Sequence, residues 1–132
     1  MTDRVRTQIE TSAAPPAAGP YSQAIRTGSL IFAAGQLGAD PATGELADGA
    51  AAQAERALLN LSAVLDAAGV SLDRVVKTTV FLSDMANFAT VNEVYARHFS
   101  APYPARSTFA VRELPRGGLV EIECIAIAPD AA

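Results

Sequence analysis

The spacing of apolar residues predicts two helices. Between about residues 49 and 68, apolar side chains recur every three or four positions, which gathers them in one stripe on a helix that Gly69 ends. Asp84 is a candidate N-cap for a second helix, and Pro102 lies beyond its end. One face of this second helix would carry Phe88, Val91, Tyr95 and Phe99.

Period-two alternation and short apolar runs predict strands in the rest of the chain. Residues 75–82 are β-branched and apolar on both faces apart from Lys77 and the threonines, which is typical of a central strand. Thr27-Gly28-Ser29 suits a hairpin connection, and the Ala- and Pro-rich residues 12–20 suit a loop. The predicted strands are residues 4–10, 21–26, 30–34, 75–82, 106–111 and 120–128.

The predicted elements follow the order βββαβαββ along a single domain that spans residues 1–132. This order predicts an α+β fold, a mixed sheet with two helices packed on one face. The pattern supplies nothing to cover the other face of the sheet. A partner subunit would cover it, although a curled sheet or long loops could do the same, so the pattern favours a homo-oligomer.

Composition excludes several classes of protein. Half of the residues are apolar and 18% are charged, which is unlike a disordered chain. The net charge of −4 and the scattered Lys and Arg argue against nucleic acid as a partner. No apolar window approaches the ~20 residues of a membrane span, and the single Cys124 permits no intrachain disulfide. We therefore expect a cytoplasmic protein with no membrane partner.

The last predicted strand carries an unusual mixture of side chains. Glu121 and Glu123 alternate onto the same face as Ile125 and Ile127. A carboxylate on an apolar face must be hydrogen-bonded, paired with a cation or raised in pKa, and the nearest candidate cation is Arg106. A structural alternative remains open, in which the glutamates lie at the solvated end of the strand and Arg106 makes an ion pair with no catalytic role.

Other candidates for chemistry are weaker. His98 is the lone histidine, on a predicted helix surface, and no Gly-x-Ser-x-Gly turn supplies a nucleophile for it to activate. Cys124 alternates with Ile122 and Ala126, as expected of a small core residue. One histidine and one cysteine are too few ligands for a closed zinc site, so we expect no metal.

Six segments of the chain occur in the order that marks a known protein family. These segments are Gly19-Pro20-Tyr21-Ser22-Gln23-Ala24, Gly35-Gln36, Val76-Lys77-Thr78-Thr79-Val80-Phe81, Phe88-Ala89-Thr90-Val91-Asn92, Pro104-Ala105-Arg106-Ser107 and Val120-Glu121-Ile122-Glu123. In residues 14–128 the chain resembles the Rid (RidA/YjgF) family of reactive intermediate enamine/imine deaminases. Six ordered matches are far more specific than one short motif.

The resemblance implies a chorismate-mutase-like subunit in a homotrimer with clefts between adjacent subunits. It also implies hydrolytic deamination, without a cofactor, of small imino acids and enamines such as 2-aminoacrylate, 2-iminopropanoate and 2-iminobutanoate. The products would be 2-oxoacids and ammonia. Arg106 would hold the substrate carboxylate, because a planar guanidinium binds it with two hydrogen bonds, and Glu121 would orient and partly deprotonate a water.

The same resemblance implies four further substrate-binding residues. Tyr21 would wall or hydrogen-bond the cleft, Gly35 would let the backbone approach the ligand closely, and Asn92 would lie near the cleft. Simpler interpretations are a packing residue, a strand-end glycine and a helix-surface amide. Thr108 stands where many members of the family have cysteine, and it would act through its backbone.

Ala34 stands where many members of the family have serine, so any contact made by that hydroxyl is absent here. Two other functions stay open. The first is an endoribonuclease or translation inhibitor, against which the acidic charge and the shortage of His and Lys argue. The second is a binding protein that captures small carboxylates through Arg106 without turnover.

Overall fold

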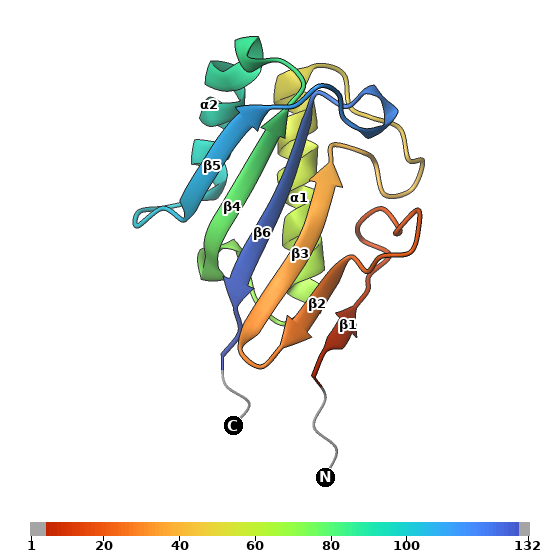
Figure 1. Ribbon diagram of the computed structural model, residues 1–132, viewed down its shortest axis with the longest axis vertical. Coiled ribbons are helices and arrows are strands. Elements are labelled where there is room, and N and C mark those ends of the chain that lie inside the picture. The colour runs from red at the N-terminus through yellow and green to blue at the C-terminus, as the bar shows by residue number, and fades with distance from the viewer. Residues whose placement is uncertain (1–4, 130–132) are drawn as a thin grey trace.

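A mixed sheet of six strands forms the frame of the protein in a computed structural model that describes residues 5–129. The strand order is β1-β2-β3-β6-β4-β5, in which only the β4–β5 pair is parallel. Helices α1 and α2 lie behind the sheet in Figure 1, and no other described element covers the face toward the viewer. The elements are β1 Thr7–Ile9, β2 Ala24–Thr27, β3 Leu30–Leu37, α1 Ala50–Ala67, β4 Val75–Leu82, α2 Phe88–His98, β5 Ala105–Ala110 and β6 Val120–Ile127, with 3-10 turns η1 Leu72–Arg74, η2 Met85–Asn87 and η3 Pro115–Gly117.

Alternation along the strands divides the sheet into a covered face, which packs on the helices, and an open face. The covered face and the inner side of α1 form the core, which includes the fully buried Ile31, Leu58, Leu61, Leu82 and Ile122. The open face carries apolar side chains that remain exposed: Leu30, Phe32, Phe109 and Ile127. Large exposed apolar side chains gathered on one sheet face are typical of a surface that another subunit covers.

The predicted order of elements and the fold class are confirmed, while several element boundaries differ. The first strand is only Thr7–Ile9, and the predicted start at residue 4 lies outside the described residues. The second strand begins at Ala24, because Tyr21 belongs to the preceding loop. Asp84 caps η2 rather than α2, since its side chain accepts a hydrogen bond from the Ala86 backbone N–H. None of the described helices is long and apolar enough to cross a membrane.

The connections along the chain place strands that are distant in sequence next to one another in the sheet. α2 connects the parallel strands β4 and β5, so its inner face packs over the β5 edge of the sheet. β6 inserts between β3 and β4 and pairs antiparallel with both. This insertion puts the carboxylates of β6 in the middle of the sheet, two strands away from Arg106 on the β5 edge.

Candidate active site

Arg106 lies on β5, and its side chain turns toward the helices. Its register partner on β4 is Thr78, which is fully buried on the covered face, and side-by-side residues of paired strands point to the same face. The Arg106 Cζ lies 4.8 Å from the centroid of the Tyr95 ring and 5.8 Å from that of Phe88, both on α2. The guanidinium therefore rests against aromatic rings at the edge of the sheet.

A hollow of about 450 Å³ opens beside this guanidinium. It is lined by Asn92, Tyr95, Ala96, Tyr103, Pro104 and Arg106. Among residues 5–129, the side-chain hydrogen bonds and ion pairs include none made by the Arg106 guanidinium. A half-buried cation with unused in-plane donors next to a small hollow can hold a carboxylate with two hydrogen bonds.

Thr108 extends the same surface, because it follows Arg106 by two residues on one strand. Its register partner is Val80, a core residue of the covered face. The Thr108 Oγ1 is buried and has no hydrogen-bond partner among the described residues. A buried hydroxyl without a partner is costly, but Thr108 does not line the hollow beside Arg106, so its backbone is the better candidate for a ligand contact.

Glu121 lies on the open face of the sheet. Its register partners are Leu37 on β3 and Phe81 on β4. Burial raises the pKa of Glu121 above its ordinary value, because desolvation disfavours the charged form, and repulsion by Glu123 raises this pKa further. A carboxylate with a raised pKa is a stronger base than an ordinary glutamate.

Gly35 leaves the space that the Glu121 carboxylate occupies. The pairing of β3 with β6 is irregular between Ala33 and Gln36, and Gly35 falls in this irregular stretch. A Cβ added to Gly35 would lie only 2.9 Å from the Glu121 Cδ, which is closer than carbon atoms pack. Gly35 is therefore required for the position of Glu121, a contact that the spacing in sequence did not reveal.

Arg106 and Glu121 point to opposite faces of the sheet. The interpretation of these two residues as a structural ion pair is therefore wrong within one subunit, since within residues 5–129 the ion pair found is that of His98 with Glu55. The reason is the strand register: Thr78, which is buried, faces the same side as Arg106, whereas Phe81, three residues along β4, flanks Glu121 on the other side. The predicted site residues thus form two groups, an arginine group of Asn92, Arg106 and Thr108 and a glutamate group of Gly35 and Glu121.

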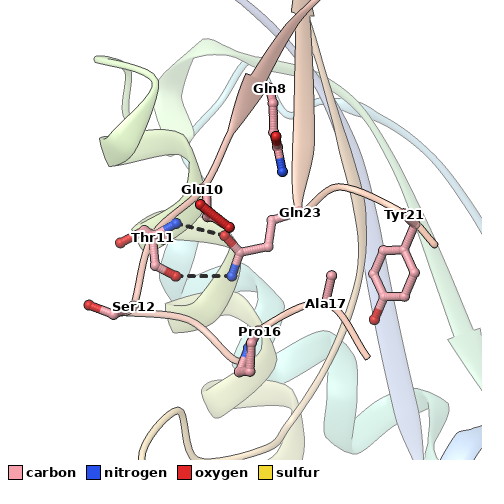
Figure 2. Close-up of a pocket in the computed structure, with 8 residues that line it drawn as sticks. All are labelled: Gln8, Glu10, Thr11, Ser12, Pro16, Ala17, Tyr21 and Gln23. Atoms are coloured by element: carbon pink, nitrogen blue, oxygen red, sulfur yellow. Dashed lines mark hydrogen bonds between the residues drawn. The ribbon is translucent and has the colours of Figure 1, made fainter. Parts of the chain in front are cut away.

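Tyr21 lies in the loop before β2 and is exposed. Its hydroxyl accepts a hydrogen bond from the Ala18 backbone N–H at 3.2 Å. Tyr21 is one of the residues that line a hollow of about 480 Å³. Figure 2 shows these residues, with the Gln23 amide hydrogen-bonded to the Thr11 backbone. Neither Arg106 nor Glu121 lines this hollow, so its volume does not identify it as the active site of one subunit.

The remaining candidates have structural surroundings. The prediction that His98 is a helix-surface residue is wrong, because its side chain is half-buried. Its Nε2 lies 2.7 Å from the Glu55 Oε1, and this contact links α2 to α1. Cys124 is a buried core residue, as predicted, and burial raises the pKa of its thiol to about 12. In the part of the chain that the structure describes, no group of three His, Cys, Asp or Glu residues could hold a metal ion.

Comparison with known proteins identifies the family. The family model described as Endoribonuclease L-PSP matches residues 11–128. The chain belongs to this family, the Rid family. The 2-iminobutanoate/2-iminopropanoate deaminase of Bos taurus is 48% identical to it over 128 residues, which cover 96% of this chain and 93% of the relative.

Two solved structures have the same fold as this Rid protein. RidA from the Antarctic bacterium Psychrobacter is 49% identical, with a TM-score of 0.90, over 92% of this chain and 98% of that one. E. coli TdcF with bound serine is 42% identical, with a TM-score of 0.89, over 93% of this chain and 99% of that one. The recognition made from the six segments and the predicted fold class are therefore confirmed.

Proposed function

We propose that this Rid protein hydrolyses small 2-imino acids and their enamine tautomers to 2-oxoacids and ammonia, as a 2-iminobutanoate/2-iminopropanoate deaminase would. The observation that carries the proposal is the Arg106 guanidinium, which is half-buried beside a small hollow and makes no described hydrogen bond or ion pair. The name of the bovine relative and the serine held by TdcF support a small ligand that carries a carboxylate.

Each proposed residue has a separate chemical task. Arg106 binds the carboxylate and thereby fixes the imine carbon, while the Asn92 side chain and the Thr108 backbone supply polar contacts. Glu121 takes a proton from a water, whose oxygen attacks the imine carbon. The imine nitrogen takes up this proton as the C–O bond forms, which gives a tetrahedral carbinolamine. Transfer of the hydroxyl proton to the amine then breaks the C–N bond, so ammonia leaves and the 2-oxoacid remains. An enamine such as 2-aminoacrylate first takes up a proton at its terminal carbon and loses one from its nitrogen to become the imine.

The opposite orientation of the two groups supports a site built from two subunits. A single sheet separates Arg106 from Glu121, so a substrate that meets both must lie between the covered-face edge of one subunit and the open face of another. Such a contact joins two different surfaces, and interfaces of this kind form closed rings when the rotation between neighbouring subunits permits closure. We propose the ring to be a homotrimer, in which the exposed Phe32 and Ile127 become buried.

The first test is an assay in which 2-aminoacrylate or 2-iminobutanoate is generated in situ and ammonia release is timed. Rapid release above the spontaneous rate is expected. Carboxylate binding with no acceleration would instead leave a small-carboxylate binding protein. An endoribonuclease role is not favoured, because the net charge is −4.

The second test asks whether one site uses two subunits. Arg106→Ala and Glu121→Gln chains, each inactive, are unfolded together in equal amounts and refolded. If each site takes its arginine and its glutamate from different subunits, random mixing restores about one quarter of wild-type turnover, because one site in four then receives both native residues. Refolded mixtures of either variant with itself are the controls. No recovery in a correctly mixed oligomer would show that both residues serve the same subunit's site.

A further inference from the structure

Tyr95 makes the closer of the two ring contacts to Arg106, at 4.8 Å against 5.8 Å for Phe88. A ring attracts a guanidinium through its π-face, and the attraction grows when water is excluded. Tyr95 is only 5% exposed, so this contact is largely shielded from solvent. The ring contact holds the cation without supplying an oxygen acceptor for its N–H groups.

The Tyr95 ring is itself held on two sides. Its hydroxyl lies 2.7 Å from the Thr78 Oγ1 in a buried hydrogen bond between α2 and β4. Its ring is tilted against that of Phe99, with 4.5 Å between the centroids. Thr78 is also the register partner of Arg106. Thr78, which fixes the Tyr95 ring, therefore lies next to Arg106, which the ring contacts.

An aromatic support differs in its consequences from an acidic one. A carboxylate partner would hold Arg106 as firmly, but it would occupy the guanidinium donors and neutralise the charge that attracts a ligand. Tyr95 leaves both available. Burial raises the pKa of the Tyr95 phenol, so the ring stays neutral at pH 7 and does not compete with a bound carboxylate.

We propose that Tyr95, clamped by Thr78, is a positioning residue that fixes the Arg106 guanidinium for two-point binding of the substrate carboxylate. The proposal rests on the carboxylate-binding part of the proposed function and adds the residues that act through Arg106. In the sequence, the apolar stripe of α2 places Tyr95 in the core. The signal for a further role is that Tyr95 carries a hydroxyl and follows Asn92 by three residues.

The test compares Tyr95→Leu and Tyr95→Phe in the wild-type and Arg106→Ala backgrounds. The probe is 2-oxobutanoate, a product of the proposed reaction, and its Kd is measured by calorimetry together with KM and kcat for the imine. In the wild-type background, Tyr95→Leu is expected to raise Kd and KM by about 10-fold, the range of a desolvated cation–ring contact. Tyr95→Phe keeps the ring and is expected to raise both by no more than about 3-fold.

The Arg106→Ala background separates positioning from general packing. There, Tyr95→Leu is expected to cause no further rise in Kd, because the residue through which it acts is gone. Val94→Ala is the matched control: Val94 is buried on the same helix, so the substitution lowers Tm without changing Kd. A Tyr95→Leu protein with wild-type Kd, or an equal rise in both backgrounds, would overturn the inference.

Thr78→Val serves if Tyr95→Leu does not fold, because it keeps the shape of the buried residue and removes only the bond to Tyr95. It is expected to raise the Kd for 2-oxobutanoate about 3-fold in the wild-type background and not at all in Arg106→Ala. An unchanged Kd in the wild-type background would remove Thr78 and the clamp from the proposal. Wild-type protein that binds 2-oxobutanoate but hydrolyses no imine would contradict the proposed function and leave this inference standing.

Discussion

Arg106 and Glu121 lie on opposite faces of one sheet, and the surroundings of the two side chains differ. On the covered face, the Arg106 guanidinium lies against the rings of Tyr95 and Phe88. On the open face, Glu121 is half-buried near Glu123, and its pKa is raised by burial first and by the charge of Glu123 second. The arginine group is thus suited to hold an anion, while the glutamate group is suited to accept a proton.

The largest expected effect comes from breaking the arginine group. Arg106→Ala removes a two-point contact and misplaces the imine, so kcat/KM should fall by at least ~10²-fold. Arg106→Lys should recover little, since a point charge cannot replace the planar fork. Steady-state kinetics of both variants, with thermal melts to verify folding, provide the measurement. Wild-type hydrolysis by a folded Arg106→Ala oligomer would contradict the proposed site.

Breaking the glutamate group should affect a different kinetic constant. Glu121→Gln keeps the shape but removes the base, so kcat should fall by roughly 10²-fold while 2-oxobutanoate still binds. The contrast with Arg106→Ala, in which the Kd for 2-oxobutanoate rises, is the sharpest test of divided roles. Equal losses of binding in the two variants would mean that the two groups do not act separately.

Gly35→Ala tests the space kept for Glu121. The new methyl carbon would lie 2.9 Å from the Glu121 Cδ, so the carboxylate must move. We expect kcat to fall by about 10-fold, because a small misplacement of a catalytic group is costly. In the Glu121→Gln background the same change should cost much less, since the base is already absent. Equal losses in both backgrounds would attribute the effect to the backbone instead.

The smallest expected effect is a shift in pH dependence. Glu121 must be ionised to act as a base, and its raised pKa means that kcat/KM falls with decreasing pH sooner than it would with an ordinary glutamate. Glu123→Gln removes one of the two causes of the raised pKa, so the acid limb should move to lower pH. Asp66→Asn, an exposed charge change on α1, is the matched control. A shift to higher pH in Glu123→Gln would contradict the assigned cause.

Local patterns were sufficient to predict the elements of this fold. The three- and four-residue spacing gave α1 and its buried face, and the β-branched run 75–82 is β4 to the residue. Alternation on β6 correctly placed Glu121 and Glu123 on one face and Cys124 in the core. These features follow from the repeat of a single helix or strand, which the sequence encodes directly.

The family and the list of candidate residues also came from the sequence, because short motifs keep their order along the chain. Their order, however, carries no information on which face of the sheet each side chain occupies. The motifs therefore suggested that Arg106 and Glu121 are neighbours, although their side chains point to opposite faces of the sheet.

Only the tertiary structure decided which of the candidate residues lie in contact with one another. β6 inserts between β3 and β4, and its register turns Glu121 toward Gly35 and away from Arg106. The contact of Tyr95 with Arg106 and its bond to Thr78 join α2, β4 and β5. The physical reason is that strand partners and registers depend on packing between distant segments, and a change of one residue in register moves every side chain to the other face.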